Sequence, residues 1–422
     1  MKITQMTALD VRFPMPPGAG SDSLHVDPLY SFATCKLRTD DGLEGTGITF
    51  TLGRGNEVVT AAIRAFWPFV RGHDVAELAA DLGARWRAWA NESQLRWLGP
   101  HKGAIHLGLA AVTGAIVDLW ARSEGKPLWR LLLDLSPEQL VALADFSTIS
   151  DVIDEAGALE LLRERRLPEA EIAAQLERGY PGYDTSVGWL GYSRDQLVTN
   201  ALSSVGRGFR AVKLKVGSPD IATDADRVAA VREAVGPEIL VMVDANQCWS
   251  VPRAIEAGRA LASSDVFWFE EPVHPDDVLG YRDVATALAP MRIAGGEHVP
   301  NQVVFKNFIR AGAIQVAQPD VVRLGGLPEF LGVALMAAEA GIPVLPHAGE
   351  TSQIHQHLIL FTRCVLGLPE LPLETIPHLA EHFVDPVQIV KGRYRPPTVP
   401  GIGAALQPDS LARHAATTEV LT

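Results

Sequence analysis

The sequence is poor in cysteine and has no long unbroken apolar run. Its three cysteines, Cys35, Cys248 and Cys364, show neither a pairing pattern nor the close spacing of a zinc knuckle, so we expect a reduced, cytosolic protein. No uninterrupted apolar stretch approaches the roughly 20 residues that cross a bilayer. The N-terminus also lacks the continuous apolar segment of a signal peptide. The sequence therefore favours neither export nor membrane insertion.

Basic residues are scarce relative to acidic ones. The chain has 37 Lys and Arg against 50 Asp and Glu, a formal charge of -13, and no basic run that could follow a phosphate backbone. We therefore expect no nucleic-acid partner. A protein with this charge must supply positive charge locally to bind an anionic substrate, through a metal ion or a few placed Lys and Arg side chains.

The apolar content is sufficient for a large core, because 47% of the 422 residues are hydrophobic. In the first third of the chain, β-branched or alternating runs predict a small antiparallel sheet, with strands at 3–13, 30–38 and 42–50. Apolar residues three and four apart then predict helices at 57–70, 75–90 and 105–123. Strands followed by helices indicate an α+β domain, which we assign to residues 1–137.

The pattern changes at about residue 141. Short apolar strand candidates, each followed by a helical segment, lie at 211–216, 239–243, 266–269, 292–294, 314–317 and 343–345. This alternation predicts a parallel βα architecture, and at this length a closed barrel over residues 138–384. We expect residues 159–179 to be an extra charged helix inserted after the first barrel strand, and residues 385–422 to return to the N-terminal domain and complete it.

Ionisable residues recur where the predicted barrel strands end. Successive members of this series are 23 to 29 residues apart, about one βα unit; they are Lys215, Asp244, Glu270, Glu297, Asp320, His347 and Glu374. In a barrel these side chains converge at the mouth formed by the C-terminal ends of the strands, where active sites of this fold are built.

Two lysines share one face of the strand Val-Lys-Leu-Lys-Val, because Lys213 and Lys215 are two residues apart. Alone, this motif could be an edge strand protected by lysines. A barrel has no edge, however. Two ammonium groups inside it would repel each other and lose water, which lowers a lysine pKa and makes one of them a usable base.

Three acids come from successive strands: Asp244 in Val-Asp-Ala-Asn, Glu270 in Phe-Glu-Glu-Pro and Glu297 in Gly-Gly-Glu-His. Singly, each has an ordinary interpretation as a helix cap, a solvated charge or a loop acid. Brought into one mouth they would repel strongly unless a divalent cation lay between them. Oxygen ligands with open octahedral positions indicate magnesium.

Asp320 and His347 come from the next two strands. Alone, His347 could be a core or loop histidine. A neighbouring aspartate that accepts from one ring nitrogen would orient the ring and raise its pKa, which suits a general acid or base. His355 and His357, in His-Gln-His, have zinc-ligand character, but they fall in a predicted helix and we do not expect a zinc site there.

These residues carry a family resemblance. The order Lys-x-Lys, Asp-Ala-Asn, Glu-Glu-Pro, Gly-Glu-His, Asp, His resembles the mandelate racemase subgroup of the enolase superfamily. Four stretches, 21–28, 49–57, 188–193 and 346–349, resemble L-fuconate dehydratases. The resemblance implies a capping domain on a (β/α)7β-type TIM barrel and a homo-oligomer. After Pro-His-Ala-Gly, however, this chain has residues 350–355 where those dehydratases are glycine-rich.

The resemblance also implies roles. Asp244, Glu270 and Glu297 would bind magnesium, and Lys215 would remove the proton next to a substrate carboxylate. The other implied roles are Lys213 beside the base, His347 as an acid held by Asp320, Glu374 as a hydrogen-bonding group, and Asp22, Trp189, Asn246 and Arg323 around the substrate. We expect a dehydratase of a small acid sugar, L-fuconate first. The alternatives are a racemase or epimerase, a dehydratase of another aldonate or aldarate, and a catalytically silent barrel used for binding.

Overall fold

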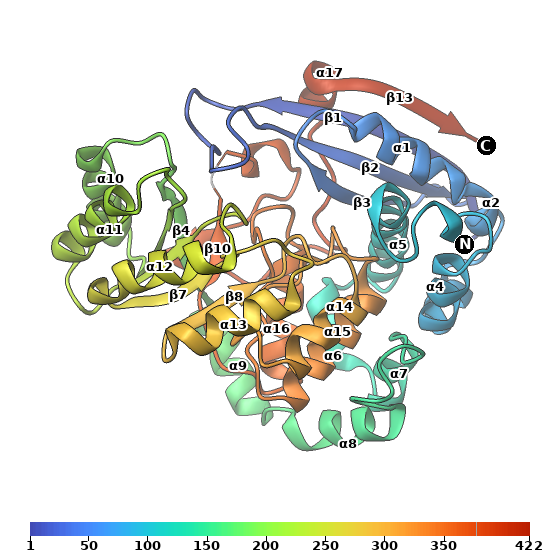
Figure 1. Cartoon of the computed structure of the whole chain (residues 1–422). Coiled ribbons are helices and arrows are strands. Elements are labelled where there is room, and N and C mark those ends of the chain that lie inside the picture. Colours follow the sequence, from blue (N-terminus) through green and yellow to red (C-terminus); the bar gives the residue numbers. More distant parts are fainter. Residues whose placement is uncertain (377) are drawn as a thin grey trace.

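The computed structural model describes residues 1–376 and 378–422 and contains two sheets, one antiparallel and one parallel (Figure 1). The antiparallel sheet has the order β13-β1-β2-β3. Its strands are β1 (Ile3–Pro14), β2 (Leu29–Thr39), β3 (Glu44–Thr51) and β13 (Ala415–Leu421). The first three match the predicted strands to within two residues at each end. The last shows that the C-terminus does return to the N-terminal sheet.

Helices follow the third strand, as the apolar spacing predicts. They are α1 (Asn56–Ala65), α2 (Trp67–Val70), α3 (Val75–Ala80), α4 (Leu82–Ala90), η1 (Arg96–Leu98), α5 (Gly103–Ser123) and α6 (Leu128–Asp134). The helix α5 packs so closely on β3 that a Cβ added to Gly47 would lie 2.0 Å from the carbonyl oxygen of Ala111. Glycine therefore allows the sheet and the helix to touch backbone to backbone.

Helix α5 is long and apolar enough to cross a membrane by length and composition, which the sequence analysis did not anticipate. Within the fold, 78% of its most apolar 18-residue window is buried. Its apolar character is thus that of a core helix in a soluble protein, where neighbours cover every face.

The parallel sheet carries most of the predicted strands. They are β4 (Tyr180–Gly188), β5 (Ala211–Lys215), β6 (Leu240–Asp244), β7 (Val266–Glu270), β8 (Arg292–Gly295), β9 (Val316–Ala317) and β10 (Leu373–Thr375). Strands β4 to β9 pair in chain order, Ala317 bridges Val344, and β10 pairs with β4. The Gly349 N–H donates to the carbonyl of Glu374 at 3.1 Å, which links the last two segments and joins the strands into a ring.

A helix follows each of these strands up to β9, and one more precedes β10. They are α10 (Arg194–Gly206), α11 (Ile221–Val235), α12 (Val251–Leu261), η2 (Ala262–Ser264), α13 (Val278–Leu288), α14 (Gln302–Arg310), α15 (Leu327–Glu339) and α16 (Ile354–Cys364). Side-chain caps begin several of them; Asn301, for example, accepts from the N–H groups of Val303 and Val304. The predicted βα alternation is confirmed.

The region before β4 differs from the prediction. The prediction placed a first barrel strand before the insertion at 159–179, but between residues 137 and 179 the described structure has no strand and begins with the helix α7 (Pro137–Ala142). A capping box of Ser136 and Gln139, with proline at the first helical position, explains its start. The charged insertion is two helices, α8 (Glu155–Arg165) and α9 (Glu169–Arg178), and both precede β4, the first barrel strand.

The C-terminal segment contacts both sheets. Its elements are η3 (Ala380–His382), β11 (Ile389–Val390), β12 (Arg393–Tyr394), α17 (Pro408–His414) and the strand β13. Strand β12 pairs with the barrel strand β4 before β13 pairs with β1. The buried Asp118 of α5 connects the C-terminal segment to the N-terminal sheet. Its carboxylate accepts from the N–H groups of Thr46 in β3 and Ile402 at 2.8 and 2.7 Å.

Direct bonds hold the N-terminal part over the C-terminal ends of the barrel strands. The Nη1 of Arg323 donates to the carbonyl of Phe50 at 3.0 Å, and Trp86 donates to the carbonyl of Gly325 at 2.6 Å. The hydroxyl of Ser23 reaches the carbonyl of Ala245, just beyond β6, at 2.8 Å. The segment 16–28 between β1 and β2 thereby lies against the mouth of the barrel.

Candidate active site

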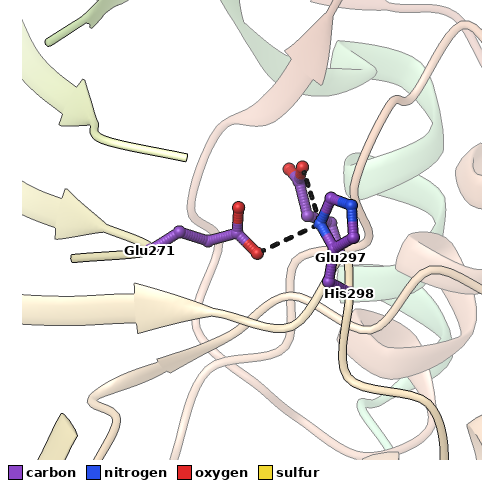
Figure 2. Close-up of side chains that lie close together, drawn as sticks. All are labelled: Glu271, Glu297 and His298. Atoms are coloured by element: carbon purple, nitrogen blue, oxygen red, sulfur yellow. Dashed lines mark ion pairs between the residues drawn. The ribbon is translucent and has the colours of Figure 1, made fainter. Parts of the chain in front are cut away.

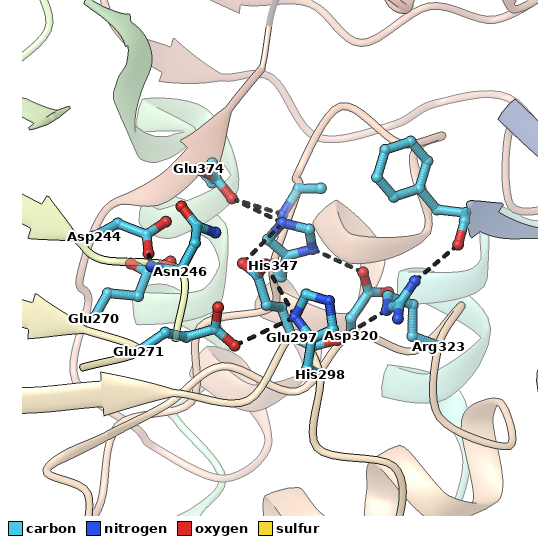
Figure 3. Close-up of polar contacts among 12 residues, drawn as sticks. Asp244, Asn246, Glu270, Glu271, Glu297, His298, Asp320, Arg323, His347 and Glu374 are labelled. Atoms are coloured by element: carbon cyan, nitrogen blue, oxygen red, sulfur yellow. Dashed lines mark hydrogen bonds and ion pairs between the residues drawn. The ribbon is translucent and has the colours of Figure 1, made fainter. Parts of the chain in front are cut away.

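The predicted series of ionisable residues does meet in one place. Strands β5, β6 and β7 are in register, so Lys215 pairs with Asp244 and Asp244 with Glu270. Figure 3 shows the side chains of Asp244, Glu270, Glu297, Asp320, His347 and Glu374 around one region at the strand ends. The structure therefore brings these side chains together at one end of the barrel.

The three acids can reach a common ion. One oxygen each of Asp244, Glu270 and Glu297 lies within 4.8 Å of the others, and all three residues are buried. Burial and the nearby carboxylates, opposed by Lys213, raise the pKa of Glu270 to about 8. Such crowding of negative charge is what a bound divalent cation relieves, so the residues fit a hard metal ion with oxygen ligands.

Both lysines are ion-paired with these carboxylates. Lys213 Nζ lies 2.6 Å from Glu270 and 2.8 Å from Glu374, and Lys215 Nζ lies 2.5 Å from Asp244. Burial lowers the pKa of each lysine, but the paired acids outweigh it and raise both pKa values. The prediction of a lowered lysine pKa is therefore wrong for the site formed by the protein's own side chains. It considered the repulsion between the two lysines and their burial, but not the carboxylates paired with them.

His347 and Asp320 form the predicted pair. The Nδ1 of His347 lies 2.9 Å from Asp320 Oδ2, while its Nε2 points into the site, 3.2 Å from Glu297. Burial lowers the pKa of His347, but Glu297, Asp320 and Glu374 overcome this and raise it to about 10. The side chain is therefore a proton donor at neutral pH in this state.

Glu374 lies at the middle of β10 and completes the ring of charges. Its second oxygen accepts from the Ala348 N–H at 3.0 Å. Burial raises the pKa of Glu374, but Lys213 and His347 outweigh it and lower the pKa to about 2. The carboxylate is thus held ionised between the lysine side and the histidine side of the site.

A cavity opens above these groups and includes the residues predicted around a substrate. Asp22, Trp189, Asn246 and Arg323 all line it, together with Lys215, Glu297, His347 and Glu374. Asn246 has a buried side-chain oxygen with no hydrogen-bond partner among the described residues, so an acceptor is available there. Arg323 differs from the others, since it also donates to the backbone carbonyls of Glu297 and Phe50 and so braces the wall.

Comparison with known proteins identifies the family. The model of the family "Enolase C-terminal domain-like" matches residues 196–410. Mitochondrial enolase superfamily member 1 of Bos taurus is 44% identical over 98% of this chain and 95% of that protein. The chain belongs to the enolase superfamily.

Other members match along their whole length. L-galactonate dehydratase of Hypocrea jecorina is 41% identical, covering 98% of this chain and 93% of that protein. The crystal structure of human mitochondrial enolase superfamily member 1 superimposes with a TM-score of 0.95 at 42% identity, covering 98% of this chain and 96% of that one. The two-domain architecture is therefore that of the enolase superfamily.

Magnesium is confirmed as the cofactor by solved relatives together with the acids of this chain. A racemase from Streptomyces coelicolor A3(2) with bound magnesium has a TM-score of 0.79 at 27% identity, and covers 98% of this chain and 100% of that one. In this member of the enolase superfamily, Asp244, Glu270 and Glu297 form an acidic group that can hold the ion.

Two further ionisable residues, Glu271 and His298, lie beside this acidic group and were not assigned from the sequence. Figure 2 shows the carboxylates of Glu271 and Glu297 directed at the same nitrogen of the His298 ring. The Nδ1 of His298 lies 3.4 Å from Glu271 and 3.3 Å from Glu297. Burial lowers the pKa of His298, but these acids raise it to about 9. The motifs Glu-Glu-Pro and Gly-Glu-His could have indicated these two residues, because Glu271 directly follows Glu270 and His298 directly follows Glu297.

The backbone is strained where the strands of this superfamily member enter the site. Asn246, Gln247, Glu271 and Ala348 have positive φ angles, between 44° and 66°. Only glycine adopts this region without steric cost, so the surrounding structure must impose it. Glu271 directly follows the last residue of β7, Ala348 follows His347, and Asn246 and Gln247 lie two and three residues after the end of β6. The strain therefore coincides with the turns that lead away from the site strands.

Proposed function

We propose that this chain is a magnesium-dependent acid-sugar dehydratase, with L-fuconate as the first candidate substrate. It would remove the C2 proton of the acid and eliminate the C3 hydroxyl to give a 2-keto-3-deoxy acid. The observation that carries the proposal is that Lys215 and His347 both line one cavity, with the metal-binding acids beside them. In this proposal a capping domain, 1–137 completed by 385–422, covers a (β/α)7β barrel over 138–384.

The acids of β6, β7 and the segment after β8 would hold the ion. Magnesium held there would supply a Lewis acid for the substrate carboxylate, and Asp244 and Glu270 would then no longer need the lysine ammonium groups as counter-charges. Among the described residues, Asp244 is the one carboxylate within ion-pair distance of the Lys215 ammonium. Once Asp244 binds the ion, Lys215 loses this partner and can act as the base. Lys213 stays fixed by Glu374 at 2.8 Å.

The proton transfers balance across the cavity. Neutral Lys215 takes the proton from C2, and the electron pair of the C2–H bond is delocalised into the substrate carboxylate. Lys213, paired with the ionised Glu374 at 2.8 Å, would present a fixed cationic donor to that developing charge. The C3–O bond then breaks as protonated His347 gives its Nε2 proton to the leaving hydroxyl, which departs as water. The resulting enol tautomerises to the keto acid.

One wall of the cavity favours an acid sugar with one carboxylate. Asp22 lines it and is buried, and its carboxylate accepts from the N–H groups of Leu24 and His25. A second substrate carboxylate placed against Asp22 would be repelled, whereas a hydroxyl could donate to it. L-fuconate is the 6-deoxy form of L-galactonate, and a relative is an L-galactonate dehydratase, so both aldonates come before the diacids.

A substrate panel tests the proposal directly. Purified protein would be incubated with magnesium and L-fuconate, L-galactonate, other aldonates and galactarate, and 2-keto-3-deoxy product would be measured. We expect turnover of at least one aldonate, lost on chelation of the metal and absent in Glu270→Gln. No turnover of any acid sugar by a protein that binds magnesium would overturn the proposal.

A racemase or epimerase is the second candidate, because a base and an acid, Lys215 and His347, line the same cavity. Deuterium from D2O in recovered substrate, without keto acid, would favour this reading. Failure of the wild type to bind magnesium in calorimetry would favour the silent barrel. We also propose the mandelate racemase subgroup, a cytoplasmic location and a homo-oligomer that acts on a small molecule and has no nucleic-acid or membrane partner.

A further inference from the structure

A second histidine contacts the Asp320–His347 pair from behind. His355 lies in the first turn of α16 and is fully buried. Its Nε2 is 3.1 Å from Asp320 Oδ1, while the other oxygen of Asp320 contacts His347 Nδ1 at 2.9 Å. Both oxygens of the carboxylate are therefore occupied by imidazole rings from two different segments.

The other side of the His355 ring holds the backbone next to His347. Its Nδ1 lies 3.0 Å from the carbonyl oxygen of Ala348, the residue that follows His347 and has a φ of +53°. The Ala348 N–H in turn donates to Glu374 at 3.0 Å. One ring thus touches both the partner of His347 and the strained peptide that sets where His347 points.

The ring of His355 links the two peptides that follow the paired residues. Its Nδ1 contacts the carbonyl of Ala348, the residue after His347, and its Nε2 accepts from the N–H of Val321, the residue after Asp320, at 3.3 Å. Asp320 Oδ1, which lies 3.1 Å from the same Nε2, also accepts from the N–H of Val322 at 2.9 Å. Burial raises the pKa of Asp320, yet His355 and His347 outweigh it and lower that pKa.

We propose that His355 is a positioning residue that fixes Asp320 and the Ala348 peptide so that His347 aims its Nε2 at the leaving group. This inference rests on the proposed dehydration for its kinetic consequence. Lys215, on the other side of the site, has no contact with His355. Loss of His355 should therefore impair hydroxyl elimination and spare removal of the C2 proton.

The kinetic test uses His355→Leu, His355→Gln and the control His357→Gln. His357 is also buried in α16, but its Nδ1 accepts from the N–H of Trp129, away from the site. Keto-acid formation and C2-proton exchange would be measured in D2O with magnesium. Removing a residue that orients a metal ligand typically lowers activity about 10-fold to 100-fold, and we expect a loss of the same order when a residue that orients His347 is removed.

For His355→Leu we expect elimination to fall at least about tenfold, with exchange within about threefold of wild type and magnesium binding unchanged. His355→Gln, whose amide can donate to Asp320, should recover part of the loss, and His357→Gln should keep the wild-type ratio of exchange to elimination. Equal loss of both rates in His355→Leu, or loss of neither, would overturn the proposal.

Ring NMR on protein with 15N-labelled histidine decides the same point without turnover. We expect an Nδ1–H signal of His347 that is lost or broadened in His355→Leu but kept in His357→Gln. An unchanged His347 signal in His355→Leu would overturn the proposal. If the wild type turns over no acid sugar, the proposed function fails, and these spectra alone test the positioning role.

Discussion

Replacing Lys215 with alanine separates proton abstraction from metal binding. Lys215 is 8% exposed at the cavity, and Lys213 cannot take its place because Glu374 holds its ammonium at 2.8 Å. A positioned general base contributes about 10²-fold to 10⁴-fold. Lys215→Ala should therefore raise the barrier to C2-proton removal by about 3 to 5 kcal/mol.

The assay is loss of the C2–H signal in D2O, followed by proton NMR on the acid sugar that the wild type turns over fastest. Magnesium binding, followed by calorimetry, should persist, because Lys215→Ala removes a competing counter-ion of Asp244 and no ligand. Lys306→Ala is the matched control, since this lysine of α14 bonds Thr148 and Asp151 far from the cavity. Exchange in Lys215→Ala within tenfold of wild type would assign the base to another residue.

Three further changes test the fold that positions the site. Asp118→Ala should cost about 2–6 kcal/mol of unfolding free energy in urea, because two buried N–H groups lose their acceptor; a cost under 1 kcal/mol would contradict this. Gly47→Ala should lower the thermal midpoint, since its Cβ would lie 2.0 Å from Ala111 O, and an unchanged midpoint would refute that contact. Burial raises the pKa of Glu329, but the contact with His106 at 2.7 Å outweighs burial and lowers that pKa. Its stabilising contribution should be present above the unfolded pKa, near 4.5, and be lost as the pH falls below it; Glu329→Gln should show a shallower acid-induced loss of thermal stability.

The strand ends were predictable because two sequence features agree there. Asp244 and Glu270 each follow an apolar run, and they are separated by about one βα unit. In the structure, β6 and β7 end at these two residues. Local pattern and global topology agree at such positions. The spacing therefore located the site without any knowledge of contacts.

The helix at 137–142 was missed because a short apolar run does not distinguish a strand from a buried helix turn. The capping box at Ser136 and the proline after it were the discriminating signals. The lysine pKa directions and the contact of His355 with Asp320 were out of reach for a different reason. Each depends on which side chains meet across three segments, and sequence spacing carries no such information.

The pairing of β13 with β1 joins the first and last strands of the chain. During synthesis, the sheet over the barrel mouth can be completed only after residues 415–421 have left the ribosome. A chain that stops before Ala415 would contain every charged residue of the site but would lack the edge strand of the covering sheet. Assembly of that sheet therefore waits for a strand that is made long after β1.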